Sequence, residues 1–338
     1  MRAKGAYDTL NSMDISSWQD QIKDAIRDPS LLLEMIDLPT TTTNLARQSL
    51  QQFPLRVPRS FAAAITAGDP ADPLLRQVLP DAAEDLAVEG FSIDPLGEAR
   101  RQPAPGLLAK YPGRVLLVAT GACAIHCRYC FRRHFPYAEH NPSQQDWQAA
   151  LAVIRGDDSI KEVILSGGDP LSLPDARLSQ LVTRLEAIPH LQRLRIHTRM
   201  PVVVPERITA ALLTLLAGTR LQTVVVIHAN HAREIGDAAA RALDAIYRRG
   251  LALLNQSVLL KGVNDNAPVL AELSERLFRF HVLPYYLHML DPVAGAAHFR
   301  VDDDRARAIM RELRRRLPGY LVPRLVREEE GELSKTPL

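Results

Sequence analysis

Alternating strand-like and helix-like segments constrain the fold of this chain more than any other sequence feature. Six apolar runs, followed by a seventh β-like run, are separated by stretches whose apolar residues recur at helical spacing. The runs are 114–120, 162–167, 193–199, 221–229, 251–260, 282–289 and 320–326. Strands that alternate with helices and carry near-continuous apolar runs are typical of a parallel sheet covered by helices. We therefore predict an α/β fold whose units form a partial (β/α)6-type barrel, with a doubly wound open sheet as the alternative.

The segment before the first run is predicted to be helical. Trp18, Ile22 and Ile26 recur at helical spacing, and prolines separate the helical pieces. A stretch rich in proline and glycine, 94–106, then has the composition of a linker. We predict three parts: a helical N-terminal domain (1–95), a barrel (96–326) and a C-terminal tail (327–338).

Charge and hydropathy argue against several classes of partner. The formal net charge is +2 and the basic residues are scattered, so the sequence lacks the basic stripe that nucleic-acid-binding proteins use. The N-terminus has no apolar signal-peptide core, and no window approaches the roughly 18 apolar residues of a membrane span. We expect a cytoplasmic protein that binds neither nucleic acid nor membrane, and for which a homo-oligomer is possible.

Polar residues of unusual kinds follow the predicted strands at one end. In α/β barrels, the loops at the carboxyl ends of the strands build the active site. The residues concerned are the cysteine-bearing loop 121–133, the GGDP turn 167–170, His197, Arg199, His228, Gln256, His288, Asp291, Glu328 and Lys335. We expect them to meet at one rim of the barrel.

The three cysteines of the chain, Cys123, Cys127 and Cys130, all lie in the first of these loops. An odd number of closely spaced cysteines argues against a disulfide framework and for metal binding or catalysis. Thiolates are the ligands of iron–sulfur clusters, and three of them leave one iron of a four-iron cube open. An open iron can chelate a small molecule, as the open position of a catalytic zinc does. The spacing therefore predicts a site-differentiated 4Fe-4S cluster.

Two other interpretations of this loop stay open. The cysteines could be small residues of the core, or they could bind a structural zinc with a fourth ligand from His126 or His134. The neighbouring Arg128, Arg132 and Arg133 are expected to favour the thiolate form of the cysteines. This polar, arginine-rich setting favours a metal site over a core role.

The spacing C-x3-C-x2-C, with Tyr129 before the third cysteine, resembles the radical S-adenosylmethionine (SAM) superfamily. The resemblance extends to the turn of Gly167, Gly168 and Asp169, which in that family lies near the methionine amino group of SAM. Glycines let the backbone approach a ligand closely, although such a turn before a helix needs no ligand. The resemblance implies that the reduced cluster cleaves SAM to a 5′-deoxyadenosyl radical.

Longer stretches narrow this resemblance. PGLLAKYPGRVLLVATGACAIHCRYCFRRHF (105–135), RIHTRMPVVVPERI, NQSVLLKGVND and PYYLHMLD are similar to the lysine 2,3-aminomutase family, most of all to the branch that modifies elongation factor P. The likeness covers roughly residues 90–338. It implies an isomerase that moves the α-amino group of L-lysine to the β-carbon. It also implies SAM contacts from His228 and Gln256, although buried polar groups near strand ends can equally be structural.

The resemblance further implies pyridoxal 5′-phosphate (PLP), which can delocalise a radical on a migrating nitrogen. It assigns the Schiff-base lysine to Lys335, which without the resemblance would be an ordinary exposed tail residue. Lys110, Tyr111 and Arg114 match the positions that hold the cofactor phosphate, and cationic and hydroxyl donors suit that anion. Without the resemblance, these three residues would be a charged strand entry.

Substrate contacts are implied at three positions. Arg132 matches the arginine that binds the substrate carboxylate, and a guanidinium fork suits bidentate capture. Asp291 matches an acid that binds the ε-ammonium of lysine, although an aspartate before a proline can also simply start a turn. Glu328 stands where the family pattern has a second acid, an aspartate, and it lies in an acidic run of the kind that is ordinarily solvated.

The resemblance leads to a prediction of function. We predict a lysine 2,3-aminomutase whose β-lysine goes to a ligase for elongation factor P, with an external electron donor for the cluster. No cysteine follows Cys130 to form the zinc-binding tail of the family members in free-lysine catabolism, which favours the elongation-factor branch. The alternatives are a 2,3-aminomutase for another amino acid, such as glutamate or arginine, and a non-catalytic iron–sulfur protein for electron transfer or iron sensing. Asp291 argues against glutamate.

Overall fold

A single nine-stranded sheet organises the chain, whose computed structural model describes residues 17–42, 45–137 and 147–338. The strands are β1 (Leu107–Tyr111), β2 (Arg114–Thr120), β3 (Glu162–Gly167), β4 (Arg193–Thr198), β5 (Gln222–His228), β6 (Ala252–Val258), β7 (Leu283–His288), β8 (Arg324–Arg327) and β9 (Thr336–Pro337). Strands β2 to β8 are parallel, whereas β1 and β9 pair antiparallel with the two outer ones. Six predicted strands are confirmed, whereas the seventh, 320–326, is a strand only from Arg324, because Gly319–Leu321 form a 3-10 helix. The two edge strands have no counterpart among the predicted ones.

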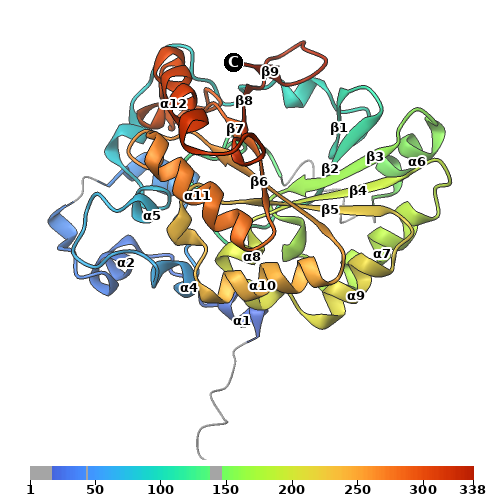
Figure 1. The fold of residues 1–338 in the computed structure, drawn as a ribbon, viewed down its shortest axis with the longest axis horizontal. Helices are drawn as coiled ribbons and strands as arrows, with labels where there is room; N and C mark the ends of the chain where they lie inside the picture. Colours follow the sequence, from blue (N-terminus) through green and yellow to red (C-terminus); the bar gives the residue numbers. More distant parts are fainter. Residues whose placement is uncertain (1–16, 43–44, 138–146) are drawn as a thin grey trace, which may run out of the picture.

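The strand order distinguishes between the two predicted architectures. A doubly wound sheet reverses its strand order at a switch point, whereas here each strand pairs with its neighbours in sequence. Strands β1 and β9 form the two edges of the described sheet, so the barrel stays open along one side. The fold is a partial barrel, with β1 and β9 both at the upper side of the view in Figure 1.

Helices cover the outer face of the parallel strands (Figure 1). They are α6 (Gln148–Gly156), α7 (Asp175–Glu186), α8 (Met200–Val203), α9 (Ala210–Gly218), α10 (Asp237–Arg248), α11 (Ala267–Arg279) and α12 (Asp303–Arg316). Side-chain caps start two of them: Thr209 accepts a hydrogen bond from the backbone of α9, and Asn266 does so for α11. Their apolar stripes face inward, as with Leu178, Leu181 and Leu185 of α7. Over the described ranges, no helix has the length and apolar character needed to cross a membrane.

Short helices precede the barrel and share its core. They are α1 (Trp18–Lys23), α2 (Pro29–Met35), α3 (Arg47–Gln52), α4 (Arg59–Ala62) and α5 (Pro73–Arg76). Leu32 and Leu74 belong to the same hydrophobic cluster as Leu117 of β2. The stretch 94–106 is not an exposed linker, because Glu98 within it is buried. The predicted domain boundary at residue 95 stays a prediction.

Candidate active site

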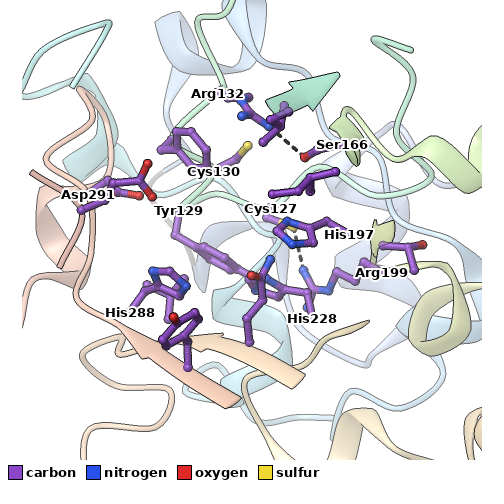
Figure 2. Close-up of a pocket in the computed structure, with 18 of the residues that line it drawn as sticks. Cys127, Tyr129, Cys130, Arg132, Ser166, His197, Arg199, His228, His288 and Asp291 are labelled. Atoms are coloured by element: carbon purple, nitrogen blue, oxygen red, sulfur yellow. Dashed lines mark hydrogen bonds between the residues drawn. The ribbon is translucent and has the colours of Figure 1, made fainter. Parts of the chain in front are cut away.

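A large cavity of about 1150 Å³ lies inside the partial barrel. Pockets for single drug-sized ligands span about 300–1,000 Å³, so this cavity has room for more than one small molecule. Every site residue predicted from the sequence lines it: Lys110, Tyr111, Arg114, Cys123, Cys127, Cys130, Arg132, Gly167, Gly168, Asp169, His228, Gln256, Asp291, Glu328 and Lys335. Figure 2 shows residues from the loop after β2 and from β3, β4, β5 and β7 around this space.

The three cysteines reach the cavity from the loop that follows β2, and all are half-buried free thiols. Backbone hydrogen bonds tie this loop to the N-terminal segment. The His126 N–H donates to the Arg56 carbonyl at 2.9 Å, and the Arg128 N–H donates to the Gln77 carbonyl at 2.8 Å. The short helices before the barrel therefore help to fix the loop.

The structure does not support the zinc interpretation of this loop. His126 is hydrogen-bonded through Nδ1 to the Pro54 carbonyl at 2.8 Å and stacks on Phe53. His134 is hydrogen-bonded through Nε2 to the Ala294 carbonyl at 3.1 Å. Both imidazoles serve structural contacts, whereas three thiols facing a large cavity suit a cluster bigger than one ion.

Burial sets the ionisation of the thiols. Desolvation raises the pKa of Cys123, and it raises the pKa of Cys130 to about 11. The three neighbouring arginines include Arg132 and Arg133, which lower the pKa of Cys130 as expected, although burial and the adjacent Cys127 outweigh them. Those three arginines are already paired with two buried acids, Glu84 and Glu98, which neutralise most of their charge. Cluster iron would supply the positive charge that deprotonates the thiols, as a metal does for any coordinating thiol.

A buried network holds Cys127 from one side. Arg199 donates from Nη1 to the Cys127 Sγ at 2.7 Å, a contact drawn in Figure 2. Its Nη2 donates to Glu234 at 2.7 Å and to Gln77 at 2.9 Å. These partners fix the guanidinium, so it orients the sulfur. Hydrogen bonds to sulfur are one way in which a protein sets the potential of an iron–sulfur cluster.

The glycines of the GGDP turn are required by the backbone of the cysteine loop. Gly167 has a φ of +116°, and a Cβ on Gly168 would lie 2.3 Å from the carbonyl oxygen of Ala122. The Asp169 carboxylate accepts hydrogen bonds from the Thr198 hydroxyl at 2.8 Å and from the backbone N–H of Arg199 at 2.7 Å. This carboxylate ties the turn after β3 to the end of β4. Its predicted contact with SAM stays a prediction.

His228 and Gln256 lie side by side at the carboxyl ends of β5 and β6, where they are register partners. The Nε2 of His228 is 3.0 Å from the Tyr129 hydroxyl, so the aromatic residue of the cysteine motif contacts the end of β5. Burial lowers the pKa of His228 to about 3, which keeps the imidazole neutral near pH 7. A neutral imidazole has one donor and one acceptor nitrogen, which suits a polar ligand without net charge.

Five charged side chains form an ion-pair chain toward the open side of the barrel. Glu98 contacts Arg132 Nε at 2.8 Å and Lys110 Nζ at 3.1 Å. Glu328 then contacts Lys110 Nζ at 2.8 Å and Lys335 Nζ at 2.6 Å. All five side chains are at most 20% exposed, so Lys335 is not an exposed tail residue and Glu328 is not on a solvated face. The ion-pair chain joins residues predicted for substrate, phosphate and Schiff base.

The acids in this region differ in ionisation. Burial alone would raise the pKa of Glu328, but the ammonium groups of Lys335 and Lys110 outweigh burial and hold this pKa well below its usual range. At Asp291, in the loop after β7, the same two ammonium groups lower the pKa but do not outweigh burial. Burial and then the charge of Glu328 raise the pKa of Asp291 to about 7. Asp291 therefore titrates near physiological pH, whereas Glu328 stays ionised.

The predicted phosphate-binding residues are engaged with protein groups. Burial and the carboxylate of Glu328 raise the pKa of Tyr111, which hydrogen-bonds to that carboxylate. The Arg114 guanidinium lies 4.8 Å from the centre of the Tyr111 ring. Lys110 serves the ion-pair chain described above. Their contacts with a phosphate stay predictions.

Glu98 and Ser166 line the cavity but were not named from the sequence, and His197 was expected at the rim without an assigned role. Glu98 gave no signal, because it lies in a stretch with linker composition. Ser166 accepts a hydrogen bond from Arg132 Nη1 at 3.0 Å, and its place just before the GGDP turn on β3 could have indicated it. His197 has a buried Nε2 without a hydrogen-bond partner among the described residues, and its position at the end of a predicted strand was a usable signal.

Comparison with known proteins agrees with this site. Residues 117–273 match the family model described as the radical SAM superfamily. An L-lysine 2,3-aminomutase from Escherichia coli (strain K12) is 51% identical over 331 residues, 98% of this chain and 96% of that protein. An L-lysine 2,3-aminomutase from Clostridium subterminale is 33% identical over 333 residues, 98% of this chain and 80% of that protein. This chain therefore belongs to the lysine 2,3-aminomutase family of the radical SAM superfamily.

Proposed function

We propose that this chain is an L-lysine 2,3-aminomutase, an isomerase that converts L-lysine to β-lysine. One observation carries the proposal: one cavity brings together three thiols, a half-buried lysine, and a cation and acids suited to the two ends of a lysine molecule. The family membership, at 51% identity to a relative of that name, supports the same reaction.

The residues of the cavity fit the cofactors of this family, which are a 4Fe-4S cluster, SAM and PLP. Cys123, Cys127 and Cys130 would hold the cluster, and the burial of Lys335 supports its assignment as the PLP lysine. When bound, the cluster with SAM supplies a carbon-centred radical, and PLP supplies a carbonyl carbon for an amino group. An external electron donor completes the requirement, because a cluster must be reduced before it can transfer an electron.

The chain's own residues bind and orient the substrate in this proposal. Arg132 binds the carboxylate through the N–H groups that protein acceptors leave free. Asp291 and Glu328 lie within electrostatic range of each other and receive the ε-ammonium. Buried charged groups of this kind reject a ligand that leaves them unpaired. The proposal therefore includes selection for a cationic side chain, and it disfavours glutamate as the substrate.

A purified-enzyme assay tests the proposed reaction. Anaerobically reconstituted, reduced protein is incubated with SAM and single amino acids, and the products are separated by chromatography. We expect a β-amino acid from lysine alone. Turnover of arginine or glutamate instead would replace the substrate, and SAM cleavage with no β-amino acid from any of them would reject the aminomutase. An electron-transfer protein would cleave no SAM.

We also propose a cytoplasmic role in which β-lysine passes to a ligase that attaches it to elongation factor P. The similarity of the motifs to the elongation-factor branch of the family supports this role. In cells that lack this protein, the intact mass of elongation factor P should fall by one β-lysyl group, and added β-lysine should restore it. An unchanged mass would reject the role while leaving the aminomutase reaction intact.

A further inference from the structure

Glu98 is a buried acid in contact with two predicted site residues of different kinds. It starts the 3-10 helix η3 (Glu98–Arg100), which follows Gly97 in the left-handed conformation. Its backbone N–H donates to the Asp94 carboxylate at 2.9 Å, which fixes the start of this turn. The Glu98 side chain is only 4% exposed, so its carboxylate must find its partners inside the protein.

The contact between Glu98 and Arg132 is a two-point one. Oε2 accepts from Arg132 Nε at 2.8 Å, and Oε1 accepts from Arg132 Nη2 at 2.9 Å. Paired bonds of this kind fix the plane of a guanidinium as well as its position. Ser166 adds a third bond by accepting from Nη1 at 3.0 Å. Arg132 is thus held from two sides before any ligand binds.

Arg132 has N–H groups that neither Glu98 nor Ser166 occupies. A guanidinium has five N–H groups, and Glu98 and Ser166 accept from three of them. Two N–H groups, one on Nη1 and one on Nη2, have no acceptor among the residues that the structure describes, and Arg132 lines the cavity. Neighbouring terminal N–H groups form a fork that matches a carboxylate. The carboxylate of Glu98 leaves this fork open rather than filling it.

We propose that Glu98 is a positioning residue, which holds Arg132 so that its two remaining N–H groups bind the carboxylate of the amino-acid substrate. This inference rests on the proposed function for one point, that Arg132 receives a substrate carboxylate. In this proposal Glu98 acts through Arg132 and not on the substrate itself. Its second contact, to Lys110 Nζ at 3.1 Å, anchors the same carboxylate from the other side.

The test compares two ligands that differ only in the carboxylate. PLP-loaded full-length protein is titrated by equilibrium dialysis, without SAM, with L-lysine and with L-lysinamide. In Glu98→Gln, the Kd of lysine should rise roughly 10- to 100-fold, because a charged hydrogen-bonded partner of the arginine is lost. The Kd of lysinamide should change less than about twofold, because this ligand has no carboxylate for Arg132 to receive. Glu330→Gln, which removes the partially exposed acid beside Arg100, is the matched control and should alter neither Kd.

Each outcome decides the proposal. Equal weakening of both ligands in Glu98→Gln would reduce Glu98 to a structural role, and unchanged or tighter lysine binding would also overturn the proposal. If Glu98→Gln does not retain PLP, the comparison is made on Glu98→Asp, which keeps the charge but shortens the reach. That variant should lose part of the preference for lysine over lysinamide, and a full preference would overturn the proposal. Failure of the proposed function is a separate result, since it would appear as the absence of β-lysine from the wild-type enzyme.

Discussion

Lysine binding should strengthen as the pH rises through about 7, because Asp291 must lose its proton before it can pair with an ammonium. Burial, together with the charge of Glu328, raises the pKa of Asp291 to about 7. A carboxyl group is neutral below its pKa and charged above it. The ε-ammonium of lysine, with a pKa of about 10.4, stays charged on both sides of this transition. The pH dependence of ionic recognition therefore comes from the acid in the protein.

The magnitude follows from the ionised fraction of Asp291. With a pKa of about 7, roughly one eleventh of the molecules carry the carboxylate at pH 6 and roughly ten elevenths carry it at pH 8. An apparent dissociation constant is the intrinsic one divided by the fraction of molecules competent to bind. If only the ionised form binds the ε-ammonium, the Kd of lysine should fall about tenfold between these two pH values.

The assay must separate Asp291 from the α-amino group of the ligand, which also binds better at higher pH. Norleucine shares that amino group and has no ε-ammonium, so the ratio of norleucine Kd to lysine Kd isolates the side-chain site. Equilibrium dialysis of PLP-loaded protein from pH 6 to pH 8 should show this ratio rising about tenfold. In Asp291→Asn, the ratio should be low and flat. A ratio independent of pH in the wild-type protein would refute the reasoning.

Four further perturbations test the cofactor sites and the fold. Lys335→Ala should abolish the absorbance of bound PLP, which Lys261→Ala, a change at an exposed lysine, should leave intact. Cys127→Ser should lower the iron and sulfide content after anaerobic reconstitution well below the wild-type value. Glu84→Gln leaves two buried arginines without their carboxylate, and urea denaturation should show a loss of about 3–5 kcal/mol in the free energy of unfolding. Gly168→Ala places a Cβ 2.3 Å from a carbonyl oxygen of the cysteine loop, and the same denaturation should show a loss of about 1–3 kcal/mol.

The strands of the barrel could be predicted because their signal is local. Strand β3 is buried on both faces and carries a continuous apolar run, whereas β4 and β6 alternate buried and more exposed residues; either pattern can be read from a strand's own residues. The edge strands β1 and β9 carry no such run: Lys110 and Tyr111 of β1 face the cavity, and β9 has two residues. Their pairing depends on neighbours that are already folded. The periodicity of the sequence alone therefore could not predict the open side of the barrel, where Lys335 lies.

The electrostatics of the site could not be predicted, because they depend on partners that are distant in sequence. The arginines near the cysteines led to the prediction of thiolates, because the acids that pair with these arginines could not be identified from the sequence. Arg128 pairs with Glu84, 44 positions earlier, and Arg132 pairs with Glu98, 34 positions earlier. Arg132 and Arg133 still lower the pKa of Cys130, but burial and Cys127 outweigh them and raise it to about 11. Residue type indicated which groups meet, whereas burial and pairing decide how they ionise.

The charge balance of the ion-pair chain explains why one cavity can receive both anions and a cation. Its three cations and two carboxylates leave one positive charge, to which Arg114 adds another nearby. Buried positive charge requires a partner, so the cavity is arranged to accept a phosphate and a carboxylate. An ammonium would be repelled by this surplus unless a further acid were ionised. We predict that Asp291 is that acid and that, with a pKa of about 7, its proton decides whether a cationic side chain is admitted.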